Sequence, residues 1–166
     1  ANEMAINQFI AHHSVIFQPE KRLMWVSTSP WQCGKYVAYD LNKIFKDTID
    51  WQHEIYSSDL TIPEDKFIDT PEFQHLLTYK KLTPLLLKKI RKKEQIEETV
   101  LKTYQASNPS LYYVYEVIGD YYEAMQQSKQ AIAYWQQALK KSIPKLQEKE
   151  RIQQKIQKQS KDGKES

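Results

Sequence analysis

The sequence predicts an α+β fold that is mostly α-helical, with a short antiparallel β segment followed by a stack of helical hairpins. Apolar residues recur with the 3.6-residue period of a helix almost throughout residues 71–160. Residues 14–40 instead show short alternations rich in β-branched and aromatic side chains, which are typical of strands. Only three glycines occur among the 166 residues, a composition that favours a helix-rich globular protein.

The pattern changes near residue 70, and this change divides the chain. We expect antiparallel strands within residues 1–45, a linker or irregular cover over 46–70, a helical domain over 71–160 and a disordered tail over 161–166. Residues 46–70 show no sustained period and contain Pro63 and several aspartates, which is why they are assigned to neither class of structure.

The β segment is expected to begin as a hairpin. Residues 14–17 and 23–27 are apolar runs of strand length, and residues 18–22 separate them as a polar turn that contains a proline. Residues 36–41 form a third expected strand. Ahead of the hairpin, residues 3–11 are partly amphipathic and predict a short helix.

The helical half has clear start signals. The Thr-Pro-Glu run at residues 70–72 supplies a hydroxyl cap, a proline at the first helical position and an acid in the first turn. Because Thr83 and Pro84 repeat this signal, the first helix is expected to break there and a second to begin. A further helix places Ile96 and Tyr104 on one face and ends at residues 108–109.

Two more helices are predicted over residues 111–124, capped by Ser110, and 128–141. Small residues are expected where two antiparallel helices approach most closely, and large ones where the gap opens. The spacing resembles the tetratricopeptide repeat, with the proline one place late; an ordinary helical hairpin is the alternative. The residues that carry this resemblance are Tyr115, Ile118, Gly119, Tyr122, Ala131, Trp135, Ala138 and Pro144.

One hairpin cannot bury its own apolar face, so neighbouring helices must cover it. The helix before the repeat can pack on one side, and the polar segment after Pro144 on the other as a cap. Tyrosines exceed the number that this core requires, and exposed tyrosine is common on peptide-binding surfaces. Tyr112, Tyr113 and Tyr121 are therefore the candidate partner-binding residues, with packing against the flanking helices as the alternative.

The N-terminal hairpin and the loop after it, within residues 9–45, resemble the last hairpin of the acyl-coenzyme A:6-aminopenicillanic acid acyltransferase family. These are N-terminal-nucleophile hydrolases related to choloylglycine hydrolases. The resemblance implies a parent that cleaves itself to expose a cysteine, whose thiol attacks an amide or thioester while its α-amine acts as the base. Here the first residue is Ala1 and Cys33 is internal, so no catalytic residue is carried over and the chain alone is expected to be non-catalytic.

Cys33 beside His12 or His13 suggests a thiol–imidazole pair, but a small semi-buried loop cysteine is the simpler interpretation. His12, His13, His53 and His75 lack the spacing of a metal site. No metal and no cofactor are therefore expected.

The charge and hydropathy of the chain limit its partners. A formal net charge of +3 is too small to indicate nucleic-acid binding, and the basic cluster over residues 88–93 is followed by glutamates. No apolar run reaches the length of a membrane span. The compartment is left open, with the cell envelope expected if a signal precedes this sequence.

Two functions follow from these patterns. The first is the C-terminal fragment of an N-terminal-nucleophile acyltransferase or amidohydrolase, whose partner is the remainder of the enzyme and whose helices serve protein interaction or stabilise the parent. The alternative is a non-enzymatic tetratricopeptide adaptor that binds a peptide. The N-terminal strands carry apolar residues that need a cover, which in the parent enzyme would be the rest of the sandwich. For this chain alone, a homodimer through the N-terminal strands is expected.

Overall fold

The computed structural model describes residues 13–46 and 55–162 and divides the chain into two units, Ala1–Thr70 and Pro71–Ser166. Over these residues the fold is α+β and mostly helical, with a four-stranded antiparallel sheet and six α-helices, which confirms the predicted class. The helix expected over residues 3–11 lies outside the described residues.

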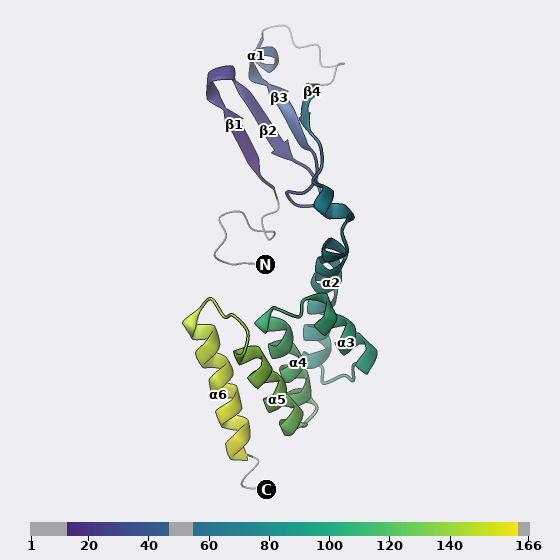
Figure 1. Ribbon diagram of the computed structural model, residues 1–166, viewed down its shortest axis with the longest axis vertical. Coiled ribbons are helices and arrows are strands. Elements are labelled where there is room, and N and C mark those ends of the chain that lie inside the picture. Colours follow the sequence, from purple (N-terminus) through teal and green to yellow (C-terminus); the bar gives the residue numbers. More distant parts are fainter. Residues whose placement is uncertain (1–12, 47–54, 163–166) are drawn as a thin grey trace. The chain divides into compact units, whose positions relative to one another are not determined.

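The first unit contains an antiparallel meander in which sequential strands are neighbours (Figure 1). A turn of 3-10 helix and the left-handed backbone of Arg22 (φ 53°) join the first two strands. The third expected strand ends at Asp40, whose carboxylate accepts the amide of Asn42 and begins the short helix α1, Leu41–Ile44. The strands are β1 Val15–Gln18, β2 Leu23–Ser27, β3 Tyr36–Asp40 and β4 Ser57–Ile62.

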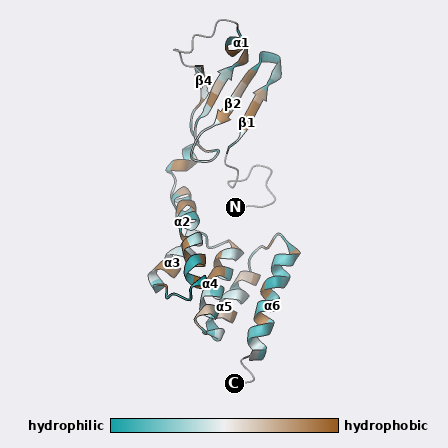
Figure 2. Cartoon of the chain, turned by 180° about the vertical axis from the view of Figure 1, so that it is seen from behind, coloured by the Kyte–Doolittle hydropathy of each residue, from teal (hydrophilic) through white to brown (hydrophobic). Residues whose placement is uncertain are grey.

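One face of the sheet is apolar along three strands. The pairing of β1 with β2 and of β2 with β3 places alternate residues on the same side. Phe17 on the edge strand β1 is 62% exposed, and Figure 2 shows hydrophobic residues along β1 and β2. The residues that share this face are Val15, Phe17, Met24, Val26, Val37 and Tyr39.

The fourth strand lies where a linker or irregular cover was expected. Residues 57–62 pair with β3 through an irregular register, and the indole N–H of Trp25 donates to the carbonyl of Leu60 at 2.9 Å. The backbone of Asp65 also donates to Cys33. These contacts are made across the sheet and its loops, so the local pattern of residues 46–70 could not indicate them.

The break expected at Thr83 and Pro84 is wrong, because α2 runs without interruption over Pro71–Arg91. Pro84 cannot donate an N–H to the preceding turn, a defect that costs about 3 kcal/mol in a helix interior. The hydroxyl of Thr83 donates to the carbonyl of Tyr79 at 2.7 Å and lies 3.1 Å from the hydroxyl of Tyr104. Leu86, one turn further on, is fully buried, so tertiary packing holds the helix together through the proline.

The second unit continues with four more helices, which pack in sequence (Figure 1). Ser110 does not cap the first helix of the central pair, since the N-cap is Leu111 and makes no side-chain cap bond. The polar C-terminal segment is helical, and its Ile152 is fully buried. The helices are α3 Glu98–Ser107, α4 Tyr112–Ala124, α5 Ser128–Leu139 and α6 Leu146–Asp162.

The core of the second unit is centred on α4 and α5 and includes buried side chains of α2, α3 and α6. Gly119 faces the indole of Trp135, and a Cβ atom at Gly119 would lie 2.5 Å from Nε1 of that ring. Trp135, Ile118, Ala131 and Ala138 are fully buried, and Tyr115 is nearly so. Tyr122 is half-buried and stacks on Tyr134, whereas Pro144 is exposed in the loop that leads to α6.

Candidate functional site

Two rows of polar side chains face each other across α4 and α6. Glu116, Asp120 and Glu123 lie at i, i+4 and i+7 on α4, a spacing that puts all three on one face of the helix. The opposing row on α6 lies at i, i+4 and i+8, which also places its members on one face, and consists of Arg151, Lys155 and Gln159. Because opposite charges meet along these rows, α6 contacts α4 through a polar seam made of these six residues.

The seam is centred on Glu116, which is only 1% exposed. Its carboxylate accepts from Nε and Nη2 of Arg151 at 3.1 and 2.8 Å, and from Nζ of Lys155 at 2.8 Å. A buried carboxylate is tolerated only when it is paired and hydrogen-bonded. Both cations come from α6, so the position of this helix is fixed by the need to satisfy Glu116.

Asp120 links three helices. Its oxygens accept from Nζ of Lys155 on α6 at 2.7 and 2.9 Å, and Oδ1 also accepts from Nε1 of Trp135 on α5 at 2.9 Å. Burial alone lowers the pKa of Lys155, but the hydrogen bonds and charges of Asp120 and Glu116 outweigh it, and the pKa is raised above its ordinary value. The ammonium of Lys155 is therefore fully charged at neutral pH.

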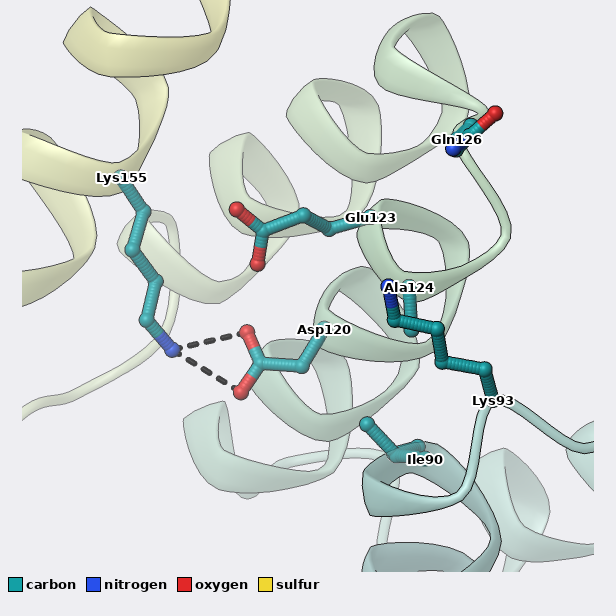
Figure 3. A pocket seen from close by; sticks show the side chains of 7 residues that line it. All are labelled: Ile90, Lys93, Asp120, Glu123, Ala124, Gln126 and Lys155. Carbon is teal, nitrogen blue, oxygen red and sulfur yellow. Dashed lines mark hydrogen bonds and ion pairs between the residues drawn. The ribbon is translucent and has the colours of Figure 1, made fainter.

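An open groove of about 510 Å³ lies beside the polar seam (Figure 3). The end of α2 forms one wall, the last turns of α4 form the floor, and Lys155 on α6 stands opposite. The groove combines apolar and polar contacts, as peptide and ligand sites do. Its lining residues are Ile90, Lys93, Asp120, Glu123, Ala124, Gln126 and Lys155.

Two of the lining residues have an unusual backbone conformation. Lys93 (φ 54°) and Gln126 (φ 60°) are left-handed residues that follow the ends of α2 and α4. In each case two backbone bonds close the helix: the amides of Lys93 and Glu94 donate to Ile90 and Lys89, and those of Gln126 and Gln127 donate to Glu123 and Tyr122. This is the position at which helices usually carry glycine, yet both residues here have long polar side chains beside the groove.

The three candidate partner-binding tyrosines occupy different environments. Tyr112 and Tyr121 are 5% and 7% exposed, and the hydroxyl of Tyr121 bonds the backbone of Ile96. Tyr113 is half-buried, and its pKa is raised first by burial and then by the charges of Glu116 and Asp120. Only Tyr113 therefore has the exposed surface that a partner could contact.

The candidate nucleophile and the candidate metal ligands do not form a site in the described residues. Cys33 is buried, and burial, together with the charge of Asp65, raises the pKa of its thiol, which opposes formation of a reactive thiolate. His13 and His75 are exposed, while His12 and His53 lie outside the described residues. No group of three or more potential metal ligands is found in the part of the chain that the structure describes.

Sequence reasoning missed the polar seam and the groove. The i, i+4 pairs Glu116–Asp120 and Arg151–Lys155 were visible and opposite in charge, and they could have indicated that α6 packs against α4. The groove had no comparable signal in the sequence. Lys93 and Gln126 line it in left-handed backbone conformations, which a sequence without glycine at these positions does not predict. No described helix is long and apolar enough to cross a bilayer.

Comparison with protein-family models, with curated proteins and with solved structures finds no match to this chain.

Proposed function

We propose that this chain is a non-catalytic interaction module whose second unit binds a peptide segment in the groove between α2, α4 and α6. The observation that carries the proposal is the groove itself, in which polar side chains from three helices surround the apolar surface of Ile90 and Ala124. Such a combination fixes the orientation of a ligand through polar contacts and holds it through burial of apolar surface.

The arrangement of helices supports a tetratricopeptide-like stack. In this interpretation α2 with α3 and α4 with α5 are successive hairpins, and α6 packs on α5 and α4 as the first helix of a third would. The groove is then lined by the first helix of each hairpin, since Lys93 follows α2, Glu123 belongs to α4 and Lys155 to α6. Repeat stacks present such a continuous surface to their partners.

The polar outer surface of α6 supports a terminal cap rather than an internal repeat. Ile152 is fully buried and Ile156 packs against the core, while most other side chains of α6 are exposed. Figure 2 shows a mostly hydrophilic helix at this position. A terminal element with a polar outer face is what ends a repeat array without exposing its core.

The test is a nuclear magnetic resonance titration of the full chain with pooled short peptides whose ends are acetylated and amidated. We expect the amide signals of Ile90, Lys93, Ala124 and Gln126 to shift. Ala124→Trp should fill the groove and abolish these shifts, whereas Ala133→Trp, at an exposed position of α5, should leave them unchanged. Absence of shifts in the second unit, or shifts that Ala124→Trp does not remove, would contradict the proposal.

The apolar face of the sheet favours a second candidate, in which this chain is the C-terminal part of an N-terminal-nucleophile acyltransferase or amidohydrolase. Phe17 is 62% exposed and Val15 40% exposed on that face, as expected for strands that pack on another β-layer. That layer would be the remainder of the parent enzyme or, for this chain alone, a second copy.

Light scattering on the whole chain tests this second candidate. We expect a dimer that Phe17→Glu converts to a monomer, while Phe45→Glu, on an exposed side chain outside the strands, leaves it dimeric. A monomer in the wild-type chain would remove the support that the exposed face gives to a missing β-layer.

A further inference from the structure

Two groups of opposite charge face the groove without an ion pair among the described residues. They are Lys93 at the end of α2 and Glu123 on α4. The carboxylate of Glu123 accepts from the neutral amide of Gln159 at 3.1 Å. Lys155, the other cation in the lining, already donates to three oxygens of Glu116 and Asp120. The groove therefore presents one cation, Lys93, and one carboxylate, Glu123, whose hydrogen-bond partner is a neutral amide and not a cation.

These two groups lie on different sides of the groove. Figure 3 shows Lys93 entering from the α2 side and Glu123 directed towards α6, with Ala124 beside them on α4. A ligand with two acidic groups would be attracted by Lys93 and repelled by Glu123. A ligand with two basic groups would be repelled by Lys93 and attracted by Glu123. Charge arrangement of this kind selects a partner more strongly than it raises affinity.

Lys93 and Gln126 each place a long polar side chain beside the groove at a position where glycine is the usual residue. Both are left-handed residues at helix ends, where glycine would be accommodated without strain. Glycine there would remove from the groove one cation and one amide. The amide of Gln126 can both donate to and accept from the backbone of an extended ligand.

We propose that the groove recognises a peptide segment carrying one acidic and one basic side chain, an inference that rests on the proposed function. Lys93 pairs with the acidic side chain and Glu123 with the basic one. Gln126 hydrogen-bonds the ligand backbone, and Ile90 and Ala124 contact an apolar side chain between the charges. Charge-assisted hydrogen bonds of this type are stronger than neutral ones, so they fix the ligand in one position.

Charge reversal tests the assignment. Four pools of short peptides with acetylated and amidated ends are titrated into the full chain: one acid and one base, two acids, two bases, and glutamines in place of both. The wild-type chain should bind the mixed pool about fivefold or more tightly than the others. Lys93→Glu should transfer the preference to the basic pool, and Glu123→Lys to the acidic pool. The double reversal should restore the preference for the mixed pool.

Each other outcome overturns the charge assignment in a recognisable way. If all four pools bind equally and Ala124→Trp abolishes binding, the groove binds peptides but does not read charge. If no pool binds, both this inference and the proposed function fail. A fifth pool, with one lysine and a free terminal carboxylate in place of the acid, identifies the source of the carboxylate. Binding of that pool alone would contradict recognition of an acidic side chain.

Discussion

Gly119 on α4 provides the space that the indole of Trp135 on α5 occupies. A Cβ atom at Gly119 would lie 2.5 Å from Nε1 of the ring, and that same nitrogen donates to Asp120 at 2.9 Å. A substitution at Gly119 therefore affects two contacts at once: the close approach of α4 and α5, and the hydrogen bond that ties α5 to the polar seam.

Gly119→Ala tests this relationship. Alanine is better than glycine in a helix interior by about 0.5–1 kcal/mol, but it would displace a fully buried indole. We expect the second effect to dominate and the variant to lose about 1–3 kcal/mol of unfolding free energy, measured by chemical denaturation with helical circular dichroism. In a Trp135→Leu background the same change should be neutral or stabilising, and an equal loss there would show that the indole is not the cause.

Glu116 and Arg151 should contribute unequally although they share a salt bridge. Glu116→Ala removes three charge-assisted hydrogen bonds from a buried position, while Lys155 keeps Asp120 and Arg151 keeps Glu148 as partners. The variant should therefore lose about 2–3 kcal/mol of unfolding free energy. The side chain of Arg151 is 46% exposed. When Arg151 is removed, Lys155 still donates a hydrogen bond to the carboxylate of Glu116. Arg151→Ala should therefore cost no more than about 1 kcal/mol. Equal losses in denaturation experiments would contradict the account of Glu116 as the buried centre of the seam.

The stabilising effect of Lys155 should disappear at alkaline pH. The pKa of Lys155 is raised in the folded protein, so its contribution is fully present below the unfolded pKa of about 10.4 and is lost as the pH rises through the folded value. The difference in melting temperature between the wild-type chain and Lys155→Met should be nearly constant between about pH 7 and about pH 9 and shrink above about pH 10.5. A difference that grows with pH would reverse the sign and refute the pairing.

The sequence predicts most of the helical unit because its information is local. The spacing of Tyr115, Ile118 and Trp135 predicted α4 and α5 to within two residues at each end. The errors arise where contacts between residues distant in the sequence determine the local structure. Pro84 reads as a helix break until the burial of Leu86 and the bond between Thr83 and Tyr104 are known.

The strands and the groove show the same limit. Residues 57–62 contain polar residues in succession, so only their pairing with β3 identifies them as a strand. The groove depends on three helices that are distant in the sequence and on two left-handed positions where glycine is the usual residue. Neither feature has a periodic signal. The candidate tyrosines were chosen because the sequence contains more tyrosines than the expected core requires, but two of the three are buried in the core.

Lys93→Gly separates the effect of residue 93 on stability from its effect on peptide binding, because both are measured on the same variant. Glycine relieves the left-handed conformation at residue 93, so the variant should gain about 1 kcal/mol of unfolding free energy. It should at the same time bind the mixed-charge peptide pool about fivefold more weakly than the wild-type chain. Lys92→Ala, which removes the adjacent charge outside the groove lining, should leave binding unchanged. A Lys93→Gly variant that is more stable and binds the pool as tightly as the wild-type chain would contradict the pairing of Lys93 with an acidic side chain of the ligand.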